Sequence, residues 1–132
     1  MASDPADLVR RAFDAFSPPD VEALLVLLHP DIEVKSLMTE AERTTYAGEH
    51  GVREWFDAVL EVFPDWRPRL EWVRELGGGA LLAGFNVTAT GAASGVAIDQ
   101  DYWLAAHTQD GLIRWYGFYR TEEEALEAAG TG

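Results

Sequence analysis

The spacing of apolar residues changes halfway along this 132-residue chain. In the first half they recur every three or four positions, as Leu8, Ala12 and Phe16 do, which places them on one face of a helix. From Trp66 onward apolar residues tend to alternate with polar ones, and glycine-containing turns separate the runs, which is typical of antiparallel strands. A helical half followed by a sheet half predicts one α+β domain over residues 1–132.

Capping and turn residues set the expected boundaries of these elements. Helices are expected over residues 5–16, 21–29, 49–63 and 121–130, and strands over residues 32–37, 66–76, 80–90, 96–108 and 112–120. Residues 38–47 are expected to form a polar loop. Asp20 is expected to cap the second helix and Thr121 the last one. Pro30 is expected to end the second helix near His29, because proline disfavours helical geometry in the residue before it.

The charge and composition limit the possible partners. With 23 acidic and 10 basic residues, the formal net charge is −13, so the surface repels phosphate backbones and anionic headgroups. We therefore expect neither a nucleic-acid nor a membrane partner. No apolar run reaches the roughly 18 residues of a membrane helix, and the first residues lack a signal-peptide pattern, which predicts a cytoplasmic protein. The absence of cysteine excludes disulfides, thiol catalysis and thiolate zinc sites.

Five short motifs occur in an order that resembles a known family. They are His29-Pro30-Asp31-Ile32-Glu33, Tyr46-x-Gly48-x-x-Gly51-Val52, Ser94-Gly95, Asp110-Gly111-Leu112-Ile113 and Glu123-Glu124-Ala125-Leu126. Together with the element order, they are similar to the SnoaL-like, polyketide cyclase-like branch of the nuclear transport factor 2-like superfamily. This resemblance implies a curved, mostly antiparallel sheet wrapped around helices into a cone, with an apolar cavity open at one end. It implies no single reaction, because the superfamily includes isomerases, cyclases, epoxide hydrolases, dehydratases and non-catalytic binders.

The catalytic residues that this resemblance implies are missing at the matching positions. SnoaL-like cyclases have an aspartate and a histidine where this chain has Phe118 and Leu104. Ketosteroid isomerase has a base where this chain has Ser36, an acid near Tyr102 or Leu104, and a tyrosine in the first helix, whereas the first tyrosine here is Tyr46. The acids of limonene epoxide hydrolase also have no counterpart. We therefore expect none of the recognised catalytic acids or bases and assign no catalytic residue.

Strand alternation gives an independent prediction of the cavity lining. Along residues 96–108 the even-numbered side chains are the more apolar set, so they should face the helices. Combined with the third helix and the last strand, this predicts a cavity lined by Ser36, Tyr46, Phe56, Val59, Phe63, Phe85, Gln100, Tyr102, Leu104, Tyr116 and Phe118. A mostly apolar lining with a few polar groups is typical of a small-molecule site. The leading interpretation is the binding of a small hydrophobic molecule, without a cofactor or a metal.

Two alternatives stay open. One is an isomerase or cyclase that acts on a small hydrophobic carbonyl compound through an unrecorded set of residues, with Tyr102 and Tyr116 as donors. The other is a non-catalytic interaction module whose cone is filled by its own side chains, chiefly Phe118 and Phe63. A void below roughly 150 Å³ between the third helix and the sheet would favour the filled module.

The other face of the predicted sheet carries large aromatic residues. Trp103 is an odd-numbered residue of the long strand, so its side chain should point away from the helices. Trp115 and Tyr119 share the corresponding face of the last strand. A monomer seldom leaves three such side chains in water, so this face is predicted to form a homodimer interface.

Two further polar patterns are interpreted as structural. His29, Asp31 and Glu33 carry metal-capable side chains, but their position fits the end of a helix and the entry to a strand. Asp99 and Asp101 could form a catalytic carboxylate pair. Their odd-numbered positions in the strand place them on the outer face, however, where solvation is expected.

Overall fold

The computed structural model describes residues 4–16, 19–35, 45–91 and 95–131. Its elements are α1 (Pro5–Asp14), α2 (Val21–Leu25), β1 (Leu28–Lys35), β2 (Thr45–Ala47), α3 (Gly48–Val62), β3 (Arg67–Gly77), β4 (Ala80–Thr90), β5 (Ala97–Gln109), β6 (Leu112–Tyr119) and α4 (Glu122–Thr131). The strands form one sheet in the order β2-β1-β6-β5-β4-β3, antiparallel except for the β1–β6 pair. The predicted α+β class and mostly antiparallel sheet are therefore confirmed.

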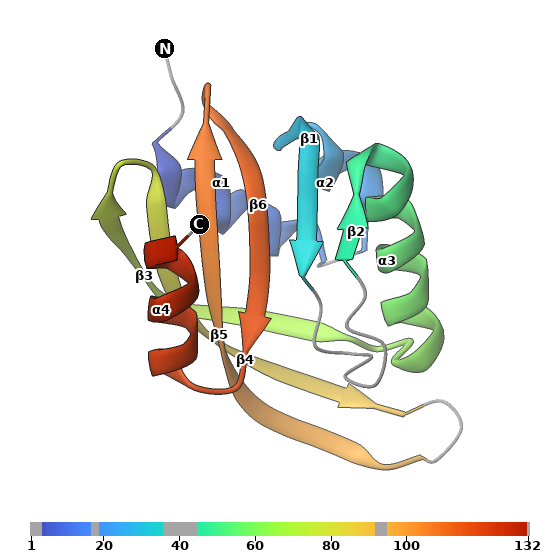
Figure 1. Ribbon diagram of the computed structural model, residues 1–132. Coiled ribbons are helices and arrows are strands. Elements are labelled where there is room, and N and C mark those ends of the chain that lie inside the picture. The colour runs from blue at the N-terminus through green and yellow to red at the C-terminus, as the bar shows by residue number, and fades with distance from the viewer. Residues whose placement is uncertain (1–3, 17–18, 36–44, 92–94, 132) are drawn as a thin grey trace.

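Helices cover both faces of the curved sheet. In Figure 1, α1 and α3 lie on one face, where α1 packs against β3 and β6 and α3 packs against β1. The shorter helix α4 lies on the opposite face, against β4, β5 and β6. The second half of β4 and the first half of β5 curve away from β6, which pairs with β5 only from Trp103 onward. With helices on its inner face, this curved sheet forms the predicted cone. None of the helices in the described part of the chain is long and apolar enough to cross a membrane.

The predicted alternation along the long strand is confirmed by two separate cores. Leu104 and Ala106 belong to the larger core, together with buried residues of α1, α2 and α3. Ala105, between them, belongs to a smaller core under α4. Side chains of successive strand residues point to opposite faces, so one strand contributes to both cores.

The aromatic residues of the outer face are covered by α4 of the same chain. Trp115 is buried with Ala125 and Ala129 of α4, and Trp103 and Tyr119 pack against this core. Trp115 is only 8% exposed. The premise that these three rings lie uncovered is wrong, because the small side chains on one side of α4 let that helix approach the sheet closely. The homodimer itself stays a prediction.

The second helix ends earlier than predicted. It stops at Leu25, and β1 begins at Leu28, before Pro30. Leu28 pairs with Ile113 of β6, but the register then shifts before Glu33. Pro30 falls within this shift, where the ladder is interrupted and its missing N–H costs no strand hydrogen bond.

The loop predicted over residues 38–47 ends in a strand. Residues 45–47 form β2, which pairs with residues 33–35 of β1. The predicted strand end at Ser36 and Leu37 and residues 38–44 of the loop lie outside the described residues.

The two predicted caps are confirmed. The Asp20 side chain accepts hydrogen bonds from the N–H groups of Glu22 and Ala23, and the Thr121 hydroxyl accepts one from the N–H of Glu124.

Candidate functional site

Two adjoining cavities lie between the helices and the inner face of the sheet. The inner cavity has a volume of about 40 Å³ and is lined by residues of α1, α3, β4, β5 and β6, with Phe16, Leu24, Trp66 and Pro68. The outer cavity has a volume of about 230 Å³ and lies at the end of α3, against β4, β5 and β6. Both linings are predominantly apolar. The volume of the outer cavity exceeds the threshold of roughly 150 Å³ below which the cone would count as filled. The volume of the inner cavity does not.

Three side chains form the wall between the cavities. Trp66, Phe85 and Phe118 line both of them. Phe118 stacks on Trp55, with ring centroids 5.8 Å apart, and meets Phe85 edge to face at 5.5 Å. It also contacts Tyr116, at 5.7 Å between centroids. The partition between the cavities is therefore made of packed aromatic rings.

Two buried polar atoms stand out beside the inner cavity. Within the described residues, neither the indole Nε1 of Trp55 nor the hydroxyl of Tyr116 has a hydrogen-bond partner. Both residues line the inner cavity. Burial raises the pKa of Tyr116 far above its ordinary value, so the phenol stays protonated and neutral. An unpartnered buried donor costs about 1–3 kcal/mol, so these two atoms call for an explanation.

The structure places six of the predicted lining residues on the cavity walls. They are Phe63, Phe85, Tyr102, Leu104, Tyr116 and Phe118. Contact of these residues with a ligand stays a prediction. Phe56 and Val59 are buried in the core beside the cavities without lining them.

Two other predicted lining residues lie away from the cavities, and a third is outside the described residues. Tyr46, on β2, is half-buried against the core and lines neither cavity. Gln100 is one of the even-numbered strand residues predicted to face the helices, but it is exposed. It lies on the part of β5 that does not pair with β6. Ser36 lies outside the described residues.

Sequence reasoning missed several lining residues, above all Trp55 and Trp66. Trp55 belongs to the apolar stripe of α3, but the spacing of that stripe does not distinguish the side chains that meet a void from those that meet a neighbouring helix. Trp66 was expected at the start of a strand, although it lies in the turn before β3. Its ring packs near Phe63, with centroids 5.9 Å apart.

The lining can donate hydrogen bonds but offers no strong base. Among the described residues that line the two cavities, none is a carboxylate or a histidine. Tyr116 is the titratable residue of the inner lining, and Tyr102 and Arg120 are those of the outer lining. A protonated phenol, an indole N–H and a guanidinium polarise or orient an acceptor; none of them removes a proton from a carbon acid at neutral pH.

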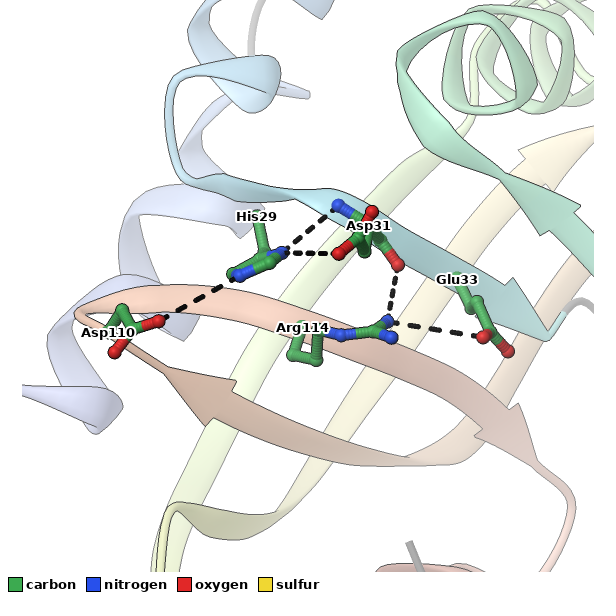
Figure 2. Close-up of polar contacts among 5 residues, drawn as sticks. All are labelled: His29, Asp31, Glu33, Asp110 and Arg114. Atoms are coloured by element: carbon green, nitrogen blue, oxygen red, sulfur yellow. Dashed lines mark hydrogen bonds and ion pairs between the residues drawn. The ribbon is translucent and has the colours of Figure 1, made fainter.

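A separate polar cluster joins β1 to the β5–β6 turn (Figure 2). The Nδ1 atom of His29 accepts a hydrogen bond from the N–H of Asp31 at 3.0 Å, and Nε2 lies 4.0 Å from a carboxylate oxygen of Asp110. Arg114 donates to the carbonyl oxygen of Asp31 and lies 4.0 Å from Glu33. Because these contacts link the strand entry to the turn, they fit the structural interpretation of the His29 motif.

The outer face carries a smaller polar cluster. The side-chain amide of Asn86 donates to Asp99 at 2.8 Å and to Asp101 at 3.1 Å. Both carboxylates are exposed, as predicted. One amide thus bridges two like charges that would otherwise repel each other across neighbouring positions of the strand.

Comparisons with known proteins agree with this architecture. Residues 9–116 match the family model of the SnoaL-like domain. The structure of TerC co-crystallized with polyporic acid superposes with a TM-score of 0.80 at 18% identity, covering 97% of this chain and 99% of that one. No curated protein sequence matches this chain.

Two other solved structures are similarly close in fold. One is wild-type IdmH, a putative polyketide cyclase from Streptomyces antibioticus, with a TM-score of 0.75, 18% identity, and coverage of 97% of this chain and 99% of that one. The other is an NTF2-like protein of unknown function from Burkholderia pseudomallei K96243, with a TM-score of 0.79, 16% identity, and coverage of 95% and 96%. At such identities the likeness shows the fold alone. The family match and the cone of helices and sheet together place this chain in the SnoaL-like domain family, with the nuclear transport factor 2-like fold.

Proposed function

We propose that this protein binds a small, largely apolar molecule inside the cone, without the acid and base residues recognised in related enzymes. The observation that carries this proposal is the pair of apolar cavities, whose linings share the side chains of Trp66, Phe85 and Phe118. TerC, which shares the fold, was co-crystallized with polyporic acid, and IdmH is a putative polyketide cyclase. These relatives support an organic ligand rather than a macromolecule.

The volumes fit a ligand of modest size. Drug-sized ligands occupy pockets of roughly 300–1,000 Å³, and the outer cavity of about 230 Å³ holds a smaller ring system. Rotation of the Phe118 ring would join this cavity to the inner one and extend the site toward Tyr116. The aromatic walls favour a flat ligand, because offset and edge-to-face ring contacts add to the free energy of apolar burial.

A filled cone is the second candidate. The inner cavity of about 40 Å³ supports it, because Phe118 occupies space between Trp55 and Phe85. The outer cavity supports ligand binding instead. An enzyme acting through Tyr102 and Tyr116 is less well supported, because the described lining holds no carboxylate or histidine to accept a proton.

The five tryptophans offer a site-resolved test. Trp55 and Trp66 line the inner cavity. Trp103 and Trp115 belong to the core under α4, and Trp72 packs over Gly84 on β4. Nuclear magnetic resonance of the indole N–H groups, during titration with the bicyclic ketone 1-tetralone or with polyporic acid, should shift the Trp55 and Trp66 signals.

The other three tryptophans are the internal control. Their signals should stay in place during the titration, because they lie on other parts of the molecule. No shift at millimolar 1-tetralone and polyporic acid, or shifts confined to Trp72, Trp103 and Trp115, would contradict a ligand site in the cone.

A further inference from the structure

We propose that the deep end of this site recognises one neutral carbonyl oxygen through hydrogen bonds from the Tyr116 hydroxyl and the Trp55 indole N–H. This inference rests on the proposed function and names the class of ligand, a ketone or quinone whose oxygen enters first. It starts from the two buried polar atoms that lack partners among the described residues. Both side chains are almost inaccessible, since Trp55 is 1% exposed and Tyr116 is 6% exposed.

The two side chains lie next to each other. Their rings meet edge to face with centroids 5.6 Å apart, and both line the inner cavity. An indole nitrogen is a donor only, and a protonated phenol carries one donor proton. A carbonyl oxygen has two lone pairs, so it can accept one hydrogen bond from each residue.

The remaining lining selects against charged and purely apolar ligand ends. A carboxylate would place a charge beside apolar side chains, and no described residue of the inner lining is a cation that could pair with it. The cation of the outer lining, Arg120, lies on the other side of the Phe118 partition. A hydrocarbon end would leave both donors unpaired. A neutral carbonyl satisfies both donors without introducing charge.

The cavity volumes also set the orientation of the ligand. About 40 Å³ accommodates a small polar group rather than a ring, since one water needs roughly 10–15 Å³ by this measure. The outer cavity of about 230 Å³ accommodates the apolar body. The carbonyl therefore points toward Tyr116 and Trp55, with the Phe118 ring turned aside, and the ring system occupies the outer cavity, which Phe63 and Tyr102 line.

Paired ligands and conservative variants test this assignment. The dissociation constants of 1-tetralone and of tetralin, which lacks the carbonyl, are measured for the unaltered protein and for Tyr116→Phe, Trp55→Phe and Tyr119→Phe. Each lost hydrogen bond should lower the preference for 1-tetralone over tetralin about tenfold, and this ratio cancels changes in apolar packing that affect both ligands. Tyr119→Phe is the matched control, because Tyr119 packs against the core under α4 and lines neither cavity, and it should leave the ratio of the two constants unchanged.

The carbonyl stretching frequency of bound 1-tetralone gives a second readout. Hydrogen bonding should lower this frequency in the unaltered protein, and Tyr116→Phe should shift it back toward the value in an apolar solvent. Tyr116→Phe keeps the ring contacts and removes an unpartnered hydroxyl, so the variant is expected to fold.

The outcomes separate the two proposals. If neither ligand binds, the proposed function fails. If both bind and the ratio of their constants is the same in the unaltered protein and in Tyr116→Phe, the proposed function stands and the carbonyl site is wrong. A loss in Tyr116→Phe with none in Trp55→Phe overturns the two-donor arrangement.

Discussion

The indole ring of Trp55 and the phenol ring of Tyr116 meet edge to face, with their planes at 74°. Trp55 lies on α3 and Tyr116 on β6, so this contact fixes the helix against the sheet at the deep end of the cone. Phe118 stacks on Trp55 as well and lines both the inner and the outer cavity. The rings that hold the helix in place thus also form the walls of the inner cavity.

Phe118→Ala should open the partition between the two cavities. We expect a higher affinity for 1-tetralone and a loss of unfolding free energy of about 2–4 kcal/mol, because a large partly buried ring is removed from the core. Ligand titration and urea unfolding measure the two effects. Phe118→Leu is the control, since it keeps most of the partition. Weaker binding in Phe118→Ala would mean that the ring contacts the ligand rather than blocking it.

Two neighbouring glycines in the β3–β4 turn should respond differently to alanine. Both have positive φ angles, of 62° at Gly78 and 86° at Gly79. A Cβ on Gly78 would meet nothing within 4 Å, whereas one on Gly79 would lie 2.6 Å from the carbonyl oxygen of Thr108. Gly78→Ala should cost about 1–2 kcal/mol for the left-handed backbone, and Gly79→Ala about 1–3 kcal/mol more for the clash. Equal losses in urea unfolding would refute this difference.

Asp65 should contribute to the pH dependence of stability. Its carboxylate accepts a hydrogen bond from the N–H of Thr90 at 2.7 Å, which lowers the pKa of Asp65 below its ordinary value. Since the pKa is lower in the folded state, the contact stabilises the fold above the unfolded-state pKa of about 4 and is lost as the pH falls through the folded-state pKa. Urea unfolding should show Asp65→Asn less stable at pH 7, with a smaller difference at pH 3.

Asp57→Asn is the control for this pH dependence, because Asp57 is an exposed residue of α3. Its effect on the free energy of unfolding should be small at both pH values. A difference between Asp65→Asn and the unaltered protein that stays constant from pH 7 to pH 3 would argue against the Thr90 contact as its cause.

The homodimer remains a prediction, and the surface around α4 is where to test it. Sedimentation equilibrium at micromolar concentration should give about twice the chain mass of 14.6 kDa. Leu126 of α4 is 44% exposed, and Leu126→Glu should dissociate a dimer formed through this side. Val26→Glu, at a 70% exposed position beside α2, should leave it intact. A mass near 14.6 kDa for the unaltered protein would exclude the dimer.

Steroid isomerisation and epoxide hydrolysis should be absent. A general acid or base typically contributes 10²–10⁴-fold to the rate, and the described lining has Phe118 and Leu104 where related enzymes have such groups. Assays with a Δ5-ketosteroid and with limonene oxide should give background rates. Turnover that Tyr116→Phe abolishes would instead support the enzyme interpretation.

Several features of this fold followed from the sequence because they depend on near neighbours in the chain. Strand β4 has the predicted bounds, residues 80–90. Leu104 and Ala105 face opposite cores, as the two-residue period requires. Asp20 caps α2 because its side chain reaches N–H groups two and three residues ahead. Local geometry determines each of these features.

The tertiary structure decided what lies opposite each face. Alternation placed Trp115 on the outer face of the sheet, but only the return of α4 across that face buries it. Helical spacing placed Trp55 in the apolar stripe of α3, but only its contact with Tyr116 puts beside a cavity two donors that have no partner among the described residues. The sequence pattern determines which side chains are buried on folding. Whether such a side chain then meets a helix, a ring or a void depends on how elements distant in the chain pack together, and no local pattern encodes that packing.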